Sequence, residues 1–262
     1  MIDKWVRCKR AFYNYYIRGL RKETDNPFLI FGKAWDSIMN IWYDRVKPCQ
    51  DVEVLQMKFR EIFKPEHDFE AKYQMRTQMQ GDQIIKGYAE AYNFNTEPFK
   101  VLQTQKEIVI KIEGLCKPLH VIIDAVVEYR DRGFMPMDNK TSGTDRKGQY
   151  NIDYQNICYI KAVEATYKRK VEGMFYNEVF ARKKIDRKCF HRLLLEKTKG
   201  QIDYAWQNFC NLANDMVDFV EKNWEDVEKF PMVYNKLICT IGNCAYQEVC
   251  EFQDNVRLFV KA

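Results

Sequence analysis

The chain has 262 residues, with 46% hydrophobic and 30% charged side chains, which is the balance of a folded globular protein. No apolar run reaches the roughly 20 residues that cross a bilayer, and the N-terminal residues lack the apolar core and cleavage site of a secretory signal. These features argue against membrane and secreted proteins and predict a cytoplasmic one. The net charge of +5 permits a nucleic-acid partner but does not by itself indicate one.

The first third of the chain has the periodicity of helices. Apolar and aromatic residues recur at spacings of three and four over residues 3–20, 28–46, 51–63 and 69–93. The first helix should stop near Gly19 and the second before Pro48, because glycine and proline commonly end helices. We expect these helices to form an N-terminal elaboration, residues 1–95, on a mixed α/β core.

The pattern changes to that of strands in the middle of the chain. Three β-rich segments separated by glycine and proline predict a strand meander, at residues 99–112, 117–129 and 133–141. The next elements are predicted to be a helix, two strands and a long amphipathic helix, at residues 149–168, 171–180, 188–196 and 197–224. This order predicts one α/β domain over residues 1–262, with a core and long helix at 96–229 and an irregular tail at 230–262.

Two acids and a lysine lie in segments predicted to be strands, where a buried charge is unfavourable without a partner. Asp124 lies inside the run LHVIIDAVVEY, and Asp138 and Lys140 end the next run, in FMPMDNKTSG. A carboxylate in such a strand needs a partner or a metal ion, and period two places Asp138 and Lys140 on one face. Carboxylates at adjacent strand ends can hold a hard divalent cation, which suits phosphodiester hydrolysis. A surface strand that ends in charges is the alternative, which the spacing alone does not exclude.

The order of these residues resembles the PD-(D/E)XK nuclease superfamily, and in particular its RecB-like branch. That pattern is a strand aspartate, then Asp/Glu-x-Lys followed by threonine, then a helix with Q-x-x-x-Y. Here the last motif is Gln155 and Tyr159, which share one helical face. The resemblance implies a restriction-endonuclease-like mixed sheet flanked by helices. It also implies a catalytic set of these two residues with Asp124, Asp138 and Lys140, and Mg²⁺ or Mn²⁺ held by the aspartates.

The same branch carries a metal-binding histidine four residues after a glycine on an upstream helix. In FGKAWDSIMN the glycine is Gly32, and Asp36 fills the position of the histidine. We expect Asp36 to supply an oxygen ligand to the metal. A changed metal preference, a weakened site and an ordinary exposed acid are the alternatives. Glu107 and Glu128 are further candidate ligands, although Glu128 lies farther along its strand than Asp124.

Nine cysteines are scattered along the chain without the pattern of a secreted disulfide framework. Three of them, Cys239, Cys244 and Cys250, crowd into CTIGNCAYQEVC, which predicts a soft metal or an iron–sulfur cluster. Several RecB-like nucleases hold a [4Fe–4S] cluster with one N-terminal and three C-terminal cysteines. The resemblance assigns the fourth position to Cys8, in RCKRAFYNYY, and gives the cluster a structural role. The first tail gap is longer than the family's usual C-x2-C-x5-C, which keeps zinc as an alternative.

The resemblance implies a divalent-metal-dependent deoxyribonuclease, an exonuclease on single-stranded ends. Such an enzyme would act in recombination, repair or phage DNA processing, in a prokaryotic or phage-infected cell. Its partners would be DNA and a helicase or recombinase. Three alternatives stay open: a structure-specific endonuclease on the same fold, a catalytically weak DNA-binding or scaffold protein, and an unrelated α/β domain with a zinc-ribbon-like tail.

Overall fold

The computed structural model describes residues 1–22, 26–68, 76–144, 150, 153–233, 235, 237–241, 244–251 and 259–261. By its internal contacts the chain divides into two compact units. The first unit consists of Met1–Asp25, Gly114–Lys117 and Gln207–Ala262, and the second of Asn26–Glu113 and Pro118–Trp206.

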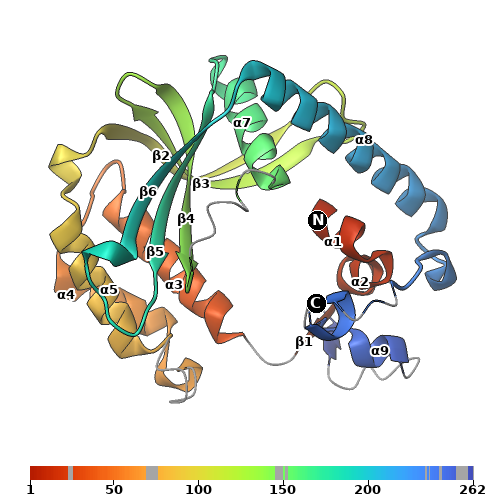
Figure 1. Ribbon diagram of the computed structural model, residues 1–262, viewed down its shortest axis with the longest axis horizontal. Coiled ribbons are helices and arrows are strands. Elements are labelled where there is room, and N and C mark those ends of the chain that lie inside the picture. The colour runs from red at the N-terminus through yellow and green to blue at the C-terminus, as the bar shows by residue number, and fades with distance from the viewer. Residues whose placement is uncertain are drawn as a thin grey trace. The chain divides into compact units, whose positions relative to one another are not determined.

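The second unit is built on a five-stranded sheet with the order β2-β3-β4-β5-β6 (Figure 1). Its strands are β2 (Phe99–Ile110), β3 (Leu119–Tyr129), β4 (Gly133–Ser142), β5 (Gly173–Phe180) and β6 (Phe190–Glu196). The first three form an antiparallel meander, β4 and β5 run parallel, and β6 returns antiparallel to β5. A parallel step needs a crossover, and α7 (Tyr154–Tyr167) lies in that connection.

The tight turn between β3 and β4 sets the register of these strands. Asp131 and Gly133 adopt φ angles of 59° and 74°, in the left-handed region that glycine enters without strain and aspartate more readily than most residues. The turn leads into a ladder that pairs Ala125 with Met137. A slip of one residue would move every side chain of β4 to the other face. The turn therefore helps to decide which face of the sheet carries Asp138.

Helices cover both faces of this sheet. On one side lie α3 (Pro27–Trp42), α4 (Val52–Ile62) and α5 (Gln78–Ala91), and α7 covers the other (Figure 1). Asn26, Asp51 and Thr77 cap these three helices, since each side chain accepts a hydrogen bond from a backbone N–H of the first turn. The apolar faces of α3, α4 and α5 pack with the sheet into one core rich in aromatic side chains. The mixed sheet between helices confirms the predicted α/β fold class.

The first unit joins the N-terminal segment to the C-terminal one. It contains α1 (Ile2–Arg7), α2 (Lys9–Phe12), a π-helix at Tyr13–Ile17, the C-terminal part of α8 (Lys199–Asn223), and α9 (Gln247–Glu251). β1 (Leu20–Lys22) pairs antiparallel with β7 (Phe259–Lys261). Rings of Trp5, Phe219 and Phe230 pack edge to face, which ties α1 to α8 and to the start of the tail.

Several predicted boundaries were wrong. The helix predicted over 3–20 is interrupted at Cys8, whose backbone is extended. The helices predicted over 69–93 and 149–168 are not continuous, because α5 begins after the capping residue Thr77 and α7 after the capping residue Asp153. Residues 69–75, 149, 151 and 152 lie outside the described residues.

The tail beyond Phe230 was predicted to be irregular, and this is wrong for α9 and β7. A five-residue helix and a three-residue strand are too short to leave a periodic pattern. Across the described parts of the chain, none of the helices has the length and apolar character needed to cross a membrane.

Candidate active site

Asp124 and Asp138 meet on the adjacent strands β3 and β4. The ladder pairs Ala125 with Met137, so Asp124 and Asp138 occupy the next positions along and face each other, where Cβ atoms lie about 5 Å apart. The two carboxyl groups are close enough for each to affect the pKa of the other. Asp124 Oδ2 also accepts a hydrogen bond from the backbone N–H of Asn139 at 2.7 Å. The structure thus brings together the two acids that the sequence singled out.

Lys140 joins the two acids from the same face of β4. Its Nζ lies 2.6 Å from Asp138 Oδ2 and donates a hydrogen bond to Gln155 Oε1 at 3.3 Å. Gln155 Nε2 donates in turn to the Tyr159 hydroxyl at 2.7 Å. Gln155 and Tyr159 are four residues apart on α7 and therefore share one face of that helix. An unbroken series of contacts links the acid of β4 to the helix that covers it.

Asp36 reaches the same group from α3. One turn earlier on that helix Gly32 lies close to β4, since a Cβ built there would be 3.7 Å from Thr141 Oγ1. Burial, and then the charges of Asp124 and Asp138, raise the pKa of Asp36 to about 8. Asp36 is therefore close enough to both strand carboxylates for their charges to affect its pKa; its role as a metal ligand stays a prediction.

Burial and mutual repulsion set the protonation of these acids. Burial raises the pKa of Asp138 to about 7, with Asp124 adding to the rise and Lys140 opposing it. Burial also raises the pKa of Asp124, although Asn139 N–H and Lys140 stabilise its ionised form. Burial alone would lower the pKa of Lys140, but the two carboxylates raise it above its usual value. Three carboxyl groups thus compete for one ammonium group.

This donor set fits a hard divalent cation. Asp36, Asp124 and Asp138 supply carboxylate oxygens, the ligands that Mg²⁺ and Mn²⁺ prefer, and together they carry more negative charge than Lys140 balances. Within the described ranges no three His, Cys, Asp or Glu side chains are arranged around one metal position. Oxygens of Asp124 and Asp138 instead contact Asn139 and Lys140. The three aspartates are the residues that would hold such an ion.

The sequence analysis missed Glu178, a fourth acid on this face of the sheet. The parallel ladder places Glu178 of β5 beside Lys140, and it is only 3% exposed. Its Oε1 accepts hydrogen bonds from Tyr150 OH at 2.6 Å and from Ser142 Oγ at 3.4 Å. The signal in the sequence was the same as for Asp124, an acid inside a run of apolar residues. Glu178 borders the acid group and is held by hydroxyl donors.

The two other candidate glutamates are not brought to this group. Glu107 is exposed on β2 and pairs with His120 at 2.8 Å. Glu128 is exposed near the end of β3, four positions from Asp124 and so about 13 Å along the strand. Neither glutamate has a described contact with Asp124 or Asp138.

Four cysteines lie near one another in the first unit. Cys8, between α1 and α2, packs in a small core with Tyr246 of the tail, and Cys244 lies against that core. Burial, and then the neighbouring thiols of Cys8 and Cys244, raise the pKa of Cys250 to about 11; Cys239 contributes to the same rise. Four thiols suit the tetrahedral sulfur ligation of an iron–sulfur cluster or zinc. In the described segments no three of these thiols are arranged around one metal position, and a metal site here stays a prediction.

The other cysteines play no part in this group. Three of them, Cys158, Cys189 and Cys210, are buried, whereas Cys49 is half-buried and Cys116 is exposed. Buried thiols of this kind act as small apolar side chains.

Comparison with known proteins identifies a family whose model matches this chain. A family model described as the PD-(D/E)XK nuclease superfamily matches residues 2–251, whereas no curated protein matches the chain. Among solved structures, the chain is similar to one from Eubacterium rectale described as a "putative exonuclease". The two are 14% identical, with 86% of this chain and 82% of that chain covered and a TM-score of 0.47. Because the family model extends over nearly the whole chain, this protein belongs to the PD-(D/E)XK nuclease superfamily.

Proposed function

We propose that this protein is a divalent-metal-dependent deoxyribonuclease of the RecB-like branch, acting as an exonuclease on single-stranded ends. The observation that carries the proposal is the convergence of Asp124, Asp138 and Lys140 in one buried group, with Asp36 facing it. Superfamily membership supports a nuclease. The proposal goes beyond superfamily membership in naming DNA as the substrate and strand ends as the place of cleavage.

The metal supplies one part of the chemistry and the chain supplies the rest. Mg²⁺ or Mn²⁺ held by Asp36, Asp124 and Asp138 would polarise the phosphate and lower the pKa of a bound water. Lys140, which its acidic neighbours keep charged, stabilises negative charge on the scissile phosphate or orients the attacking water. Gln155 accepts a hydrogen bond from the ammonium group of Lys140 and so fixes its direction.

The test is cleavage of end-labelled single-stranded DNA, double-stranded DNA and RNA in Mg²⁺ and in Mn²⁺. Shortening of labelled single strands from one end, with circular single-stranded DNA left intact, supports the proposal. Cutting of the circular DNA would instead indicate a structure-specific endonuclease on the same fold. Binding of DNA without cleavage in either metal would favour a catalytically weak DNA-binding or scaffold protein. This alternative stays open because Asp36 stands where the family has a histidine.

We also propose that Cys8, Cys239, Cys244 and Cys250 hold one [4Fe–4S] cluster. The proximity of the four thiols in the first unit supports this assignment. Protein purified without oxygen should contain iron and sulfide and absorb broadly near about 400 nm. Stoichiometric zinc without iron would select the zinc alternative, and the absence of both metals would contradict the assignment.

Organisation as a single nuclease domain over residues 1–262 also stays a proposal. The family match supports it, because residues 2–251 include parts of both units. A helicase or recombinase partner, a role in repair or phage DNA processing, and a cytoplasmic location stay predictions.

A further inference from the structure

The residue between the acid and the lysine of the D-x-K motif is a buried asparagine. Asn139 is 6% exposed, and the alternation of the strand directs its side chain to the face opposite Asp138 and Lys140. Its backbone N–H donates a hydrogen bond to Asp124 Oδ2 at 2.7 Å. Asn139 therefore connects the acid group on one face of β4 with the core on the other.

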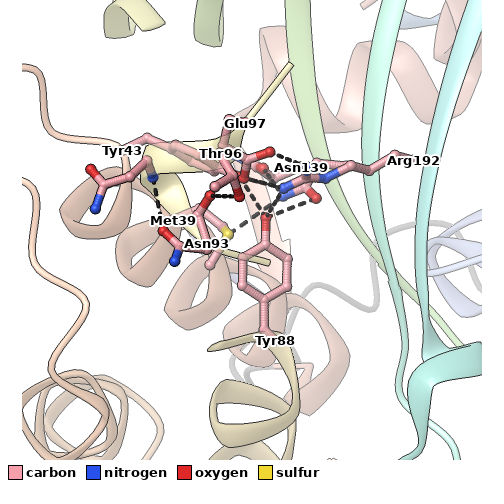
Figure 2. Close-up of polar contacts among 10 residues, drawn as sticks. Met39, Tyr43, Tyr88, Asn93, Thr96, Glu97, Asn139 and Arg192 are labelled. Atoms are coloured by element: carbon pink, nitrogen blue, oxygen red, sulfur yellow. Dashed lines mark hydrogen bonds and ion pairs between the residues drawn. The ribbon is translucent and has the colours of Figure 1, made fainter. Parts of the chain in front are cut away.

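A chain of buried polar side chains begins at Asn139 and crosses that core. Asn177 Nδ2 of β5 donates to Asn139 Oδ1 at 2.9 Å, and Tyr88 OH of α5 donates to Asn177 Oδ1 at 3.0 Å. The Tyr88 hydroxyl also contacts that of Tyr43 at 2.7 Å. Asn177, Tyr88 and Tyr43 are each at most 1% exposed. Figure 2 shows Tyr88 rising from its helix into the middle of this network.

An ion pair between Arg192 and Glu97 lies at the other end of this hydrogen-bond network. Arg192, which reaches in from β6 (Figure 2), donates to Tyr43 OH at 3.0 Å and pairs with Glu97. Burial alone would lower the pKa of Arg192, but hydrogen bonds to Glu97 raise it, so its guanidinium stays charged. Burial raises the pKa of Tyr88 to about 12, so its hydroxyl stays protonated and available as a donor.

From Arg192 to Asn139, each polar group of this network can donate a hydrogen bond to the next, while Tyr43 also donates to Glu97. Tyr88 has one hydroxyl hydrogen, which it gives to Asn177, so Tyr43 is the donor in their contact. Tyr43 shares its own hydrogen between Tyr88 and Glu97 Oε1, the latter at 3.1 Å. The hydrogen bonds therefore follow one another from Arg192 to Asn139 on β4. Hydrogen bonds connected in this way strengthen one another in a low-dielectric core.

A polar residue at this place costs stability unless every partner is present. An apolar side chain at position 139 would pack in the core without needing any hydrogen-bond partner, whereas a buried amide is destabilising when it is left unpaired. The network instead ties the Asn139 side chain to α5, β5 and β6, and to α3 through Met39 Sδ, which lies 3.5 Å from Asn177 Nδ2. Among the described contacts, the link from this network to the acid group is the peptide N–H of Asn139, which donates to Asp124.

We propose that this network positions the active site: it holds the Asn139 peptide group so that its N–H fixes the Asp124 carboxylate for metal binding. Asn139, Asn177 and Tyr88 are then positioning residues that touch neither metal nor substrate. This role rests on the proposed metal-dependent nuclease function and adds to it a second set of residues on the opposite face of the sheet.

A double-variant experiment separates positioning from stability. Asn139→Leu leaves the Asn177 amide without its acceptor, and Asn177→Leu leaves both the Asn139 amide and the Tyr88 hydroxyl without their partner, so each should lower the thermal unfolding midpoint. The double variant Asn139→Leu/Asn177→Leu replaces both amides with apolar groups and leaves the Tyr88 hydroxyl with Tyr43 as its partner, so it should recover part of that loss. Ile84→Ala is the matched control, because Ile84 is fully buried in the same core and has no polar group.

The decisive readout is Mn²⁺ affinity without DNA, measured by electron paramagnetic resonance, with cleavage kinetics alongside. We expect the double variant to bind Mn²⁺ at least about fivefold more weakly than the wild type and to need correspondingly more metal for cleavage. Ile84→Ala should stay within twofold in Mn²⁺ affinity despite its lower midpoint. Wild-type Mn²⁺ affinity in a folded double variant would overturn the positioning role while leaving the nuclease proposal intact. A wild-type protein that neither binds Mn²⁺ nor cleaves would overturn both.

Discussion

The acid group of the second unit and the cysteine group of the first differ in what holds them in place. Asp124, Asp138 and Lys140 lie on two neighbouring strands of a hydrogen-bonded ladder, so the backbone sets their spacing. The cysteines lie in or beside helical segments of only four to six residues, α1, α2, α9 and the π-helix Leu237–Ile241. Segments this short are not stable helices by themselves. The spacing of the acid group is therefore set by the sheet, whereas the cysteine group lies on short segments that need support from the rest of their unit.

Loss of Lys140 should give the largest effect in either region. Lys140→Ala removes the only ammonium that contacts Asp138 in the described structure, and we expect cleavage to fall by about 10²–10³-fold, as for removal of one transition-state donor. Binding of DNA should change little, because it is spread over many basic contacts. Cleavage rates and filter binding on one protein preparation measure both, and wild-type cleavage would contradict the assigned role.

Loss of one cysteine should affect stability more than chemistry. Metal binding contributes on the order of 10 kcal/mol to the folding of small metal-dependent domains. Cys8→Ser should therefore release the metal and destabilise the first unit by several kcal/mol, measured by denaturant unfolding.

Cys210→Ser is the control for that experiment, since Cys210 is buried in the same unit but lies outside the cysteine group. If both variants lose only about 1 kcal/mol, the cost of burying a hydroxyl without a good partner, the cysteines are ordinary core residues. The contrast between the two regions would then disappear.

The acid group should make the metal-free protein less stable as pH rises. Asp36 has its pKa raised from 3.8 to about 8 in the folded state, so between these values the folded state binds more protons than the unfolded state. Stability then falls across this window. Asp36→Asn should reduce the fall, making the metal-free variant more stable than the wild type at pH 8. Denaturant unfolding in a chelator at pH 5 and pH 8 measures this, and identical pH dependence would place Asp36 outside the group.

Asp36→Asn should also weaken metal binding, because the variant loses one negative charge and one good oxygen ligand. We expect the Mn²⁺ concentration for half-maximal cleavage to rise by about tenfold. An unchanged metal titration would make Asp36 an ordinary helix residue and would leave only two carboxylates in the site.

The smallest effects are expected at the exposed glutamates. Glu107→Ala and Glu128→Ala should change cleavage and metal requirement by less than about twofold, since exposed substitutions away from a site usually cost little. A large loss of activity in either variant would show that the acid group extends farther along β2 or β3 than the described contacts indicate.

Local patterns in the sequence were enough to predict the direction of several site residues. Alternation along β4 places Asp138 and Lys140 on one face, and the four-residue spacing of Gln155 and Tyr159 places them together on α7. The meander and its helices were also visible, because each side chain's direction within its own element follows from the period of that element. Element ends were less visible, since capping residues and not apolar residues decide them.

Which elements meet was decided only by the tertiary structure. Asp36 lies 88 positions before Asp124, and no periodicity in the sequence indicates that α3 carries Asp36 near that residue of β3. The hydrogen bond between Asn139 and Asn177 is likewise decided by the tertiary structure. The sequence shows that each asparagine needs a partner, whereas the pairing of β4 with β5 determines which partner it finds. The physical reason is that local periodicity acts over a few residues, whereas such pairs are selected by the packing of whole strands and helices.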